Sequence, residues 1–534
     1  MKYLYVIPTL CALVLQVRPQ DTGLAPKKFL SLPLGAVQAS GWIHDQLVVQ
    51  ANGLAGHEHN FYHYVSQSDW IGGNSYYSSL EEAGSYWFNG MVPLGVLLND
   101  STIQAQTQQF LDYVLDHQDS TGWLGPEVNT TKPRYLWGRY PFFFGAIQMV
   151  EANPSLADRV VPALHKFVSL ANSMLHSGQG LEDWTNTRWE DFVITLQWLY
   201  DLHPDGQEAI LIDTMKMLKW TGDPWEQVFS PAHFPQTAVE HLRNPFPVLT
   251  WHGVNMAEGL KALPSTYRFT HNQSDLDAAS VGWDLLFQYH GRPSGIYAAD
   301  EYLAGLEAVR GTLCDNTPPH GIGNDVFVER ITYNALPATL TGGEPTDMWS
   351  RQYLQQQNQI ASKNMTPNPF PEDGPYSNVF GLEPNYPESP SGLAQVQSRP
   401  HGSIAVHRGP LHYAFDIPRT EKVLTRNSQE PRAVDLEFDA SSDWQYAIDP
   451  STLRFNAGTP AGGKLPSPIF DSGLPPLTIT AAACPITWTV AGDTFAAAPP
   501  TNPACTGQMR NITLWPFGAT KLRIGEFPVF DSTK

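Results

Sequence analysis

The feature that most constrains the fold of this chain is a long series of helix-like apolar repeats between Leu34 and Asn334. Apolar side chains recur there with helical spacing, and short turns rich in Pro, Gly and Asn separate the repeats. Helices are expected at 34–54, 79–98, 101–117, 140–151, 156–175, 188–202, 207–219, 251–263 and 276–289. Helices joined in series by short turns pack as antiparallel hairpins, so the sequence predicts an all-α first part.

The pattern changes in the last third of the chain. Residues 348–360 are predicted to form one more helix, and 367–400 are rich in Pro, Gly, Ser and Asn, which is typical of a linker. After Gly402 short apolar runs alternate with turns, as they do in strands. Strands are expected at 403–407, 411–415, 477–480, 486–490, 512–515 and 521–524. Several short strands at this spacing favour a β-sandwich.

The composition argues against two classes of partner. The chain has 32 Lys and Arg against 52 Asp and Glu, a net charge of −20, so it carries no basic footprint for nucleic acid or an anionic membrane. No segment approaches the roughly 20 consecutive apolar residues of a membrane-spanning helix. The 16 Trp and 21 Tyr supply rings of the kind that sugar-binding sites use as flat platforms. For any single ring, a place in the core remains the alternative.

The N-terminus predicts export. Lys2 precedes the short apolar run 4–15, which is typical of a signal peptide, assigned here to residues 1–20. The alternative for this run is a buried first helix or strand. Acceptor sequons for N-glycosylation occur at Asn99, Asn129, Asn272, Asn364 and Asn511. Together these features predict a secreted, extracellular glycoprotein.

The four cysteines fit that environment. Cys11 would leave with the signal peptide, and Cys484 and Cys505 are candidates for a disulfide in an oxidising compartment. Cys314 is then the odd thiol, which is reactive, metal-bound or simply buried.

An ordered set of motifs gives this chain a family resemblance. The strip 295–314 reads GIYAADEYLAGLEAVRGTLC and holds the acidic pair Asp300-Glu301 and the lone Cys314. Before it stands Trp251-His252-Gly253-Val254-Asn255, and after it Arg408-Gly409-Pro410-Leu411. These motifs resemble the β-L-arabinofuranosidase group, glycoside hydrolase family 127.

The resemblance implies a multidomain α + β fold. An (α/α)6 helical toroid of the catalytic type would span residues 24–362, and a loop or linker, shorter than in the family, would span 363–401. A partial β-sandwich would follow at 402–534. The resemblance also implies a carbohydrate partner, an arabinose-containing glycan.

Site residues follow from the same resemblance. Glu301 matches the general acid/base, and His252, Glu82, Trp189 and Asp300 match or adjoin substrate-binding positions. In this family a cysteine thiolate held by zinc attacks the anomeric carbon, and the glycosyl intermediate is hydrolysed with retention. From the residues alone, a helix start is the favoured interpretation of Asp300 and Glu301, and only the family resemblance reverses this. His252 and Trp189 likewise fit places in the core.

The chain departs from the family at its zinc site. The family pattern Arg-Gly-Thr-Glu-x-Cys is one residue short in 310–314, and Thr312 stands at the position of the zinc-binding glutamate. The adjacent Cys-Cys pair expected after Pro387, one member of which is the nucleophile, is absent. Cys314 is then a remnant zinc ligand, and zinc is doubtful as a cofactor. Both losses fall at joints that resemble skipped coding segments in a gene model.

Two hypotheses about function result. The first is a secreted glycoside hydrolase that resembles non-reducing-end β-L-arabinofuranosidases and acts on arabinofuranose-containing glycans with retention. The alternative is a catalytically inactive relative, or an incomplete gene model, that keeps the fold and sugar binding.

Overall fold

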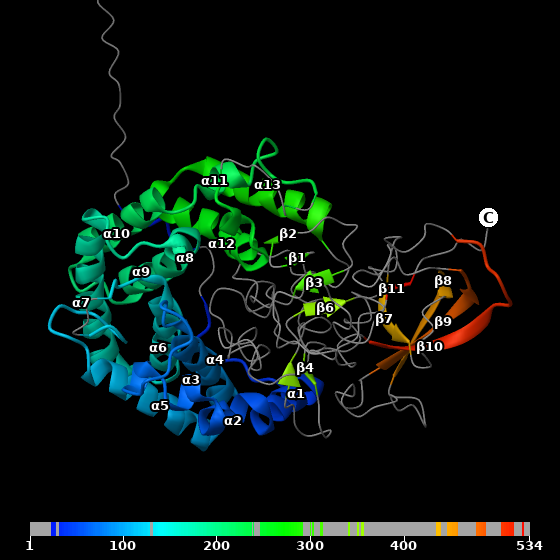
Figure 1. Ribbon diagram of the computed structural model, residues 1–534, viewed down its shortest axis with the longest axis horizontal. Helices are drawn as coiled ribbons and strands as arrows, with labels where there is room; N and C mark the ends of the chain where they lie inside the picture. Colours follow the sequence, from blue (N-terminus) through cyan, green and yellow to red (C-terminus); the bar gives the residue numbers. More distant parts are fainter. Residues whose placement is uncertain are drawn as a thin grey trace, which may run out of the picture.

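The computed structural model describes most of the helical region and the strands of the C-terminal region. The described residues are 23–27, 31–128, 132–237, 239, 246–291, 299–300, 302–303, 310–312, 340–341, 350–351, 354–356, 434–438, 446–457, 477–487, 503–516 and 526–527. The helices follow one another around an arc, and a five-stranded sheet lies to one side of it (Figure 1).

The helical region is a series of hairpins. Its helices are α1 (Gly41–Asn52), α2 (Leu54–Phe61), α3 (His63–Ser66), α4 (Glu82–Leu98), α5 (Ser101–Asp116), α6 (Tyr140–Ala152), α7 (Ala157–His176), α8 (Asp183–Thr187), α9 (Trp189–Leu202), α10 (Glu208–Thr221), α11 (Trp225–Val228), α12 (Gly253–Thr270) and α13 (Gln273–His290). Short 3-10 turns are η1 (Asp69–Ile71), η2 (Trp137–Arg139), η3 (Pro154–Leu156) and η4 (Val248–Trp251). This confirms the predicted helical first part.

Two layers of helices can be told apart by burial. Helices α4, α6, α9 and α12 are buried along nearly their whole length. Helices α5, α7, α10 and α13 pair with them and bury a narrower set of side chains. A helix that is apolar all round must be covered on all sides, so the first four helices form an inner layer. In that layer α4 packs on α6, α6 on α9, and α9 on α12.

Local sequence explains how the layers are joined. Asp100 begins α5 by accepting hydrogen bonds from the backbone amides of Thr102 and Ile103, at 2.9 and 3.0 Å. Within the inner layer, Gly145 of α6 lets α4 approach closely, because a Cβ there would lie 2.6 Å from the Phe88 ring. None of the described helices is long and apolar enough to cross a bilayer.

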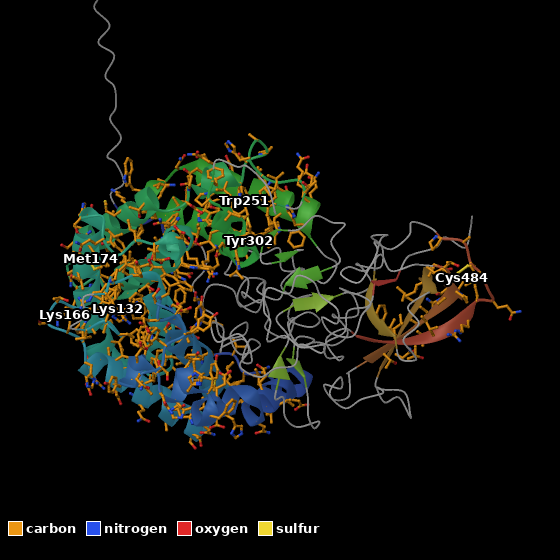
Figure 2. All side chains as sticks on the ribbon, in the orientation of Figure 1. Lys132, Lys166, Met174, Trp251, Tyr302 and Cys484 are labelled. Carbon is orange, nitrogen blue, oxygen red and sulfur yellow. A yellow bond between two sulfur atoms is a disulfide. The ribbon has the colours of Figure 1, made fainter. Side chains whose placement is uncertain are left out.

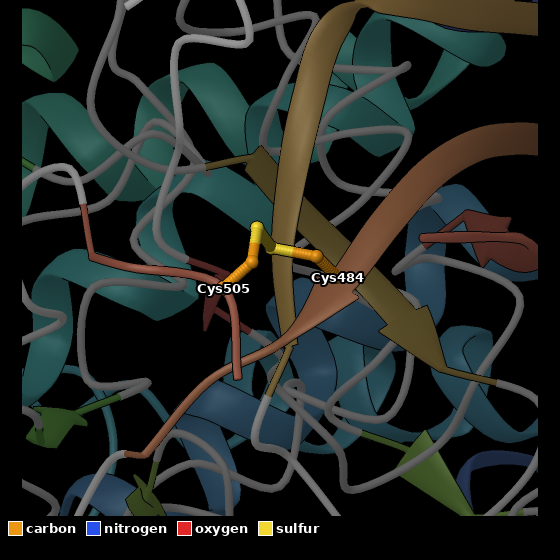
Figure 3. Close-up of a disulfide and its surroundings, with 2 residues drawn as sticks. All are labelled: Cys484 and Cys505. Atoms are coloured by element: carbon orange, nitrogen blue, oxygen red, sulfur yellow. A yellow bond between two sulfur atoms is a disulfide. The ribbon is translucent and has the colours of Figure 1, made fainter. Parts of the chain in front are cut away.

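The C-terminal strands form an antiparallel sheet in the order β11-β7-β10-β9-β8. Their bounds are β7 (Val434–Phe438), β8 (Tyr446–Ala457), β9 (Leu477–Pro485), β10 (Arg510–Pro516) and β11 (Glu526–Phe527). Ile448, Ile479, Ile512 and Leu514 are the larger residues of a small apolar core on β8, β9 and β10. A disulfide joins Cys484 at the end of β9 to Cys505, with a Cα–Cα distance of 5.5 Å (Figure 3).

The strands differ from those expected in several places. Runs at 477–480 and 512–515 lie in β9 and β10, whereas 486–487 follow β9 outside any strand. The runs at 403–407, 411–415 and 521–524 lie outside the described residues. The described strands of the C-terminal region, β7 to β11, all lie in one sheet. A β-sandwich needs a second sheet packed on the first, so the sandwich stays a prediction. The domain limits 24–362, 363–401 and 402–534 also stay predictions.

The predicted helix at 348–360 is wrong at the residues that the structure describes. Residues 350–351 form β5 (Ser350–Arg351), and 354–356 form β6 (Leu354–Gln356). Strand β5 pairs with β4 (Leu340–Thr341), and β6 pairs with β3 (Arg310–Thr312). Backbone groups that a helix would satisfy internally are therefore satisfied by neighbouring strands.

Candidate functional site

The starts of the inner helices are linked by direct contacts. Ser85 at the start of α4 donates a hydrogen bond to the carbonyl of Gly138 in η2, at 2.7 Å. The Trp137 ring of η2 stacks on Trp184 of α8, with centroids 5.1 Å apart. Trp184 in turn meets the His252 ring before α12 edge to face, at 5.6 Å. Because η2 and α8 lead directly into α6 and α9, the four inner helices begin at one continuous cluster, called here the inner-helix site.

Arg188 is the centre of the inner-helix site. It is 1% exposed, and its guanidinium donates to Asn255 Oδ1 at 2.7 Å and to the Tyr86 hydroxyl at 2.8 Å. The guanidinium carbon lies 5.2 Å from the ring centroid of Trp137 and 4.7 Å from that of Trp184. Neutral acceptors and ring faces thus replace water around the charge. Arg188 therefore ties α4, α9 and α12 together within the site.

His252 presents a polar atom with no partner in the part of the chain that the structure describes. The residue is 3% exposed, and its Nδ1 accepts or donates no hydrogen bond there. Burial and, to a smaller extent, the positive charge of Arg188 together lower the pKa of His252 to about 3. The imidazole is therefore neutral near pH 7. A neutral imidazole offers one donor and one acceptor, which suits a hydroxyl-rich ligand.

The segment that carries the predicted acid lies against His252. Strand β1 (Ala299–Asp300) pairs with β2 (Tyr302–Leu303), and Tyr302 forms a backbone bridge with His252. The rings of Tyr302 and His252 meet edge to face at 6.1 Å. Figure 2 shows Tyr302 and Trp251 in the same part of the helical arc. The described residues on both sides of Glu301 are strand, so the helix start considered as an alternative is not seen at them.

Glu301 itself lies outside the described residues, and so do Cys314, Asn129 and Asn364. For Asp300 the structure describes the backbone alone. The roles assigned to these residues stay predictions.

Glu82 is placed at the inner-helix site as the first residue of α4. It is 2% exposed, and Ser78 Oγ donates to its two carboxylate oxygens at 3.1 and 2.8 Å. Burial raises the pKa of Glu82, and hydrogen bonds from its own backbone amide and from Ser78 oppose that rise. The carboxyl therefore combines a fixed position with a proton affinity above the ordinary one. Its contact with substrate stays a prediction.

Trp189 is packed in the core. It is 1% exposed, and its Nε1 donates to the carbonyl of Asp223 at 3.2 Å. Its ring also fills the space beside Gly222, where an added Cβ would lie 1.9 Å from the ring. In this arrangement Trp189 positions the start of α9, and its predicted contact with substrate stays untested.

A buried ionic layer lies next to Arg188 on α9 and α12. Lys261 forms an ion pair with Asp191 and lies 3.7 Å from Glu258, which is itself 3.8 Å from Arg188. Glu190 is fully buried, and neither of its carboxyl oxygens has a hydrogen-bond partner among the described residues. Burial raises the pKa of Glu190 well above its usual range, which favours its protonated form. Besides Glu190, the layer holds two cations, Arg188 and Lys261, and the two carboxyl groups of Asp191 and Glu258.

The sequence alone did not single out Arg188. Trp184 and Arg188 are four positions apart, about one helical turn, which is a weak signal for a ring that contacts a cation. The partners Tyr86 and Asn255 come from distant helices, and no local pattern links them.

The residues present do not fit the zinc site that the family resemblance implies. Thr312 in β3 offers a hydroxyl where a carboxylate would be needed. Cys484 and Cys505 are joined to each other, which leaves Cys314 as the one remaining thiol besides Cys11. The described part of the chain contains no group of three His, Cys, Asp or Glu residues that is placed to hold a metal. Structural and catalytic zinc sites use at least three protein ligands, so one thiolate is not enough.

Three of the sequon asparagines are described, and all three are exposed. Asn99 ends α4, Asn272 precedes α13, and Asn511 lies on β10. The Asn272 side-chain oxygen accepts a hydrogen bond from the Ser274 amide at 3.3 Å, which leaves its nitrogen available for a glycan.

Comparison with known proteins gives a fold but no sequence family. No protein-family model matches the chain, and no curated protein matches it in sequence. Among solved structures, a GH127 beta-arabinofuranosidase is 12% identical with a TM-score of 0.56, covering 95% of this chain and 98% of its own. A protein titled glycoside hydrolase is 10% identical with a TM-score of 0.55, covering 96% and 99%.

A further match is a GH127 beta-L-arabinofuranosidase from Geobacillus stearothermophilus T6. It is 10% identical with a TM-score of 0.54, covering 92% of this chain and 99% of its own. At such low identity the likeness concerns the fold, and it extends over nearly the whole length of both chains. The chain therefore has a fold similar to that of the GH127 β-L-arabinofuranosidases.

Proposed function

We propose that this chain is a glycoside-hydrolase-like protein that binds a terminal arabinofuranose-type sugar of a glycan at the inner-helix site. The observation that carries the proposal is the Nδ1 atom of His252, a neutral polar group without a partner among the described residues, beside the rings of Trp184 and Tyr302. Sugar sites combine such ring surfaces with a few fixed polar groups. The fold similarity to β-L-arabinofuranosidases suggests the class of sugar.

Hydrolysis with retention is the second candidate. It is favoured by the contact of Tyr302 with His252, which supports a place for the neighbouring Glu301 near a bound sugar. Glu301 would then protonate the departing glycosidic oxygen. The thiolate nucleophile implied by the family resemblance has no counterpart, because no Cys-Cys pair follows Pro387. For that reason we place sugar binding first, as in a relative that has lost the zinc-thiolate chemistry.

The test is calorimetric titration of the purified chain with methyl β-L-arabinofuranoside, and with methyl β-D-xylopyranoside as a control sugar. His252→Ala should weaken binding about fivefold, because one hydrogen bond is worth about 1 kcal/mol. His176→Ala is the matched control, since His176 is an exposed histidine on α7. Equal binding by the His252→Ala variant and the unchanged chain would contradict the proposal, as would the absence of binding.

We also propose that the chain is secreted and glycosylated. The exposure of Asn99, Asn272 and Asn511 and the bond between Cys484 and Cys505 support this. Expression in a eukaryotic secretory host should release the chain into the medium, with a mass that falls on treatment with an N-glycan-cleaving enzyme. An unchanged mass would argue against glycosylation, and retention inside the cell against secretion.

A further inference from the structure

A group of exposed aromatic side chains lies on the loop that leads into α4. Tyr76 is 49% exposed and Tyr77 is 41% exposed. Tyr77 meets the ring of Tyr64 edge to face at 6.0 Å, and Tyr64 lies 4.0 Å from the ring of His63. The ammonium of Lys132 lies 4.5 Å from the ring centroid of Tyr76. These five residues are called here the tyrosine patch.

The patch is physically tied to the start of α4. Its loop is fixed by two backbone hydrogen bonds, from Ser75 to the Gln67 carbonyl at 3.0 Å and from Asp69 to the Ser75 carbonyl at 3.1 Å. Tyr77 is followed directly by Ser78, the residue whose hydroxyl binds the carboxylate of Glu82. The tyrosine patch is therefore continuous with the inner-helix site through Ser78 and Glu82.

The chemistry of the patch matches a carbohydrate. Tyrosine rings offer flat apolar faces for the C–H groups of a sugar, and their hydroxyls offer hydrogen bonds at the edges. Lys132, with a side chain 54% exposed and 3.8 Å from Glu81, adds a donor next to Tyr76. The adjoining residues Gly72, Gly73 and Asn74 are exposed and add no apolar side chain. The patch suits a protein partner less well, because a protein interface of standard size needs a surface of about 800 Å² on each partner, with an apolar centre.

We propose that the tyrosine patch is an accessory subsite that binds the sugar units following the terminal unit of a glycan. This inference rests on the proposed function, because the terminal unit is assigned to the inner-helix site. The patch would select longer glycans over single sugars and would leave the affinity for a single sugar unchanged.

The experiment compares two probes on the same protein. The first probe is methyl β-L-arabinofuranoside, and the second is a series of arabinofuranose oligosaccharides of two to four units. We expect the longest oligosaccharide to bind at least about tenfold more tightly than the methyl glycoside. In the double variant Tyr76→Ala/Tyr77→Ala that gain should fall by about tenfold, with no change for the methyl glycoside, since each ring contact supplies a modest part of the affinity.

Two controls accompany the double variant. Tyr76→Phe keeps the ring and should retain most of the gain. Trp220→Ala removes an aromatic side chain that is 83% exposed on α10 and should change neither probe. Circular dichroism of each variant checks that the fold is intact, and because all three positions are exposed we expect unchanged spectra.

The outcomes separate the two proposals. If the methyl glycoside binds and the oligosaccharides bind no more tightly, the subsite is overturned and the proposed function stands. The subsite is also overturned if the double variant keeps the full gain, or if it loses affinity for both probes equally. If neither probe binds, the proposed function fails and the subsite fails with it.

Discussion

Two arginines of this molecule are fully buried between tryptophan rings, yet their surroundings differ. Arg139 is 0% exposed and forms a direct ion pair with Glu127, with the ring centroids of Trp123 and Trp70 at 4.4 and 5.4 Å. Arg188 has a similar pair of rings, but its hydrogen bonds go to neutral oxygens of Tyr86 and Asn255.

Because of this difference, the charges of Arg139 and Arg188 act on different parts of the molecule. The charge of Arg139 is balanced by a carboxylate in direct contact, which fixes the loop around η2. The nearest carboxylate that the structure gives for Arg188 is that of Glu258, at 3.8 Å, and the charge lowers the pKa of His252. One buried arginine therefore stabilises the scaffold, whereas the other adds to the effect of burial in lowering the pKa of His252 at the candidate site.

The largest expected effect comes from breaking the Arg139 pair. Glu127→Ala should lower the free energy of unfolding by about 3–5 kcal/mol, because it leaves a buried cation without its carboxylate. Glu127→Gln keeps an acceptor oxygen and should cost clearly less. Guanidinium denaturation followed by tryptophan fluorescence measures both. A loss below about 1 kcal/mol for the alanine variant would show that the rings alone accommodate the charge.

A smaller loss of stability is expected from Arg188→Leu. Unlike a change at the Arg139 pair, this variant should also change the pKa of His252 at the candidate site. Losing the hydrogen bonds to Tyr86 and Asn255 should cost about 2–3 kcal/mol. The pKa of His252 should rise from about 3, since a positive neighbour is removed, and stay below 6.5 because burial persists. An NMR pH titration of the His252 ring measures this shift. An unchanged pKa would mean that Arg188 has no electrostatic influence on the site.

The ionic layer beside Arg188 predicts a pH dependence through Glu190. The pKa of this carboxyl is raised on folding, so the folded state holds a proton that the unfolded state releases. The contribution of this carboxyl to the free energy of unfolding is complete below about pH 4.5. Above that pH the contribution falls by about 1.4 kcal/mol for each pH unit, until the pH reaches the pKa of the folded state. Glu190→Gln removes this titration, so the variant should gain stability relative to the unchanged chain as the pH rises above about 5. A stability difference that does not change with pH would contradict a raised pKa of Glu190.

The smallest effect is expected where an arginine is exposed. Arg159 bridges Asp112 and Asp116 on the surface, and its side chain is 44% exposed. Asp112→Ala should change the free energy of unfolding by about 0–1 kcal/mol, because water and salt screen such pairs. When Asp112→Ala and Glu127→Ala are measured under the same conditions, the stability of an exposed arginine pair can be compared directly with that of a buried one. An effect as large as that of the buried pair would mean that burial does not determine the cost.

Much of the helical region was predictable because its signals are local. The helix expected at 101–117 is Ser101–Asp116, and that expected at 140–151 is Tyr140–Ala152. The first helix begins at Gly41 rather than near residue 34, because Ala36 donates to the Pro33 carbonyl in a turn at 3.0 Å. Strand β8 was missed because Pro450 interrupts its alternation, and the structure shifts register between Asp449 and Arg454.

The site was predictable only in part, because its main connections are not local. The family resemblance pointed to His252 and Glu82, which begin or precede inner helices. Arg188 was not predicted, since its role depends on Tyr86 and Asn255, which are 102 and 67 residues away in the chain. Trp189 carried the same compositional signal as Trp184, and only packing distinguishes the core ring from the one that meets His252.

The central claim is that this chain keeps a sugar site in a fold similar to that of the GH127 enzymes, without their zinc-thiolate chemistry. The most direct test is zinc stoichiometry on the purified chain, with sugar binding and release from an aryl β-L-arabinofuranoside measured on the same sample. We predict sugar binding with no stoichiometric zinc and no turnover. One zinc per chain together with turnover that Glu301→Gln abolishes would contradict the account.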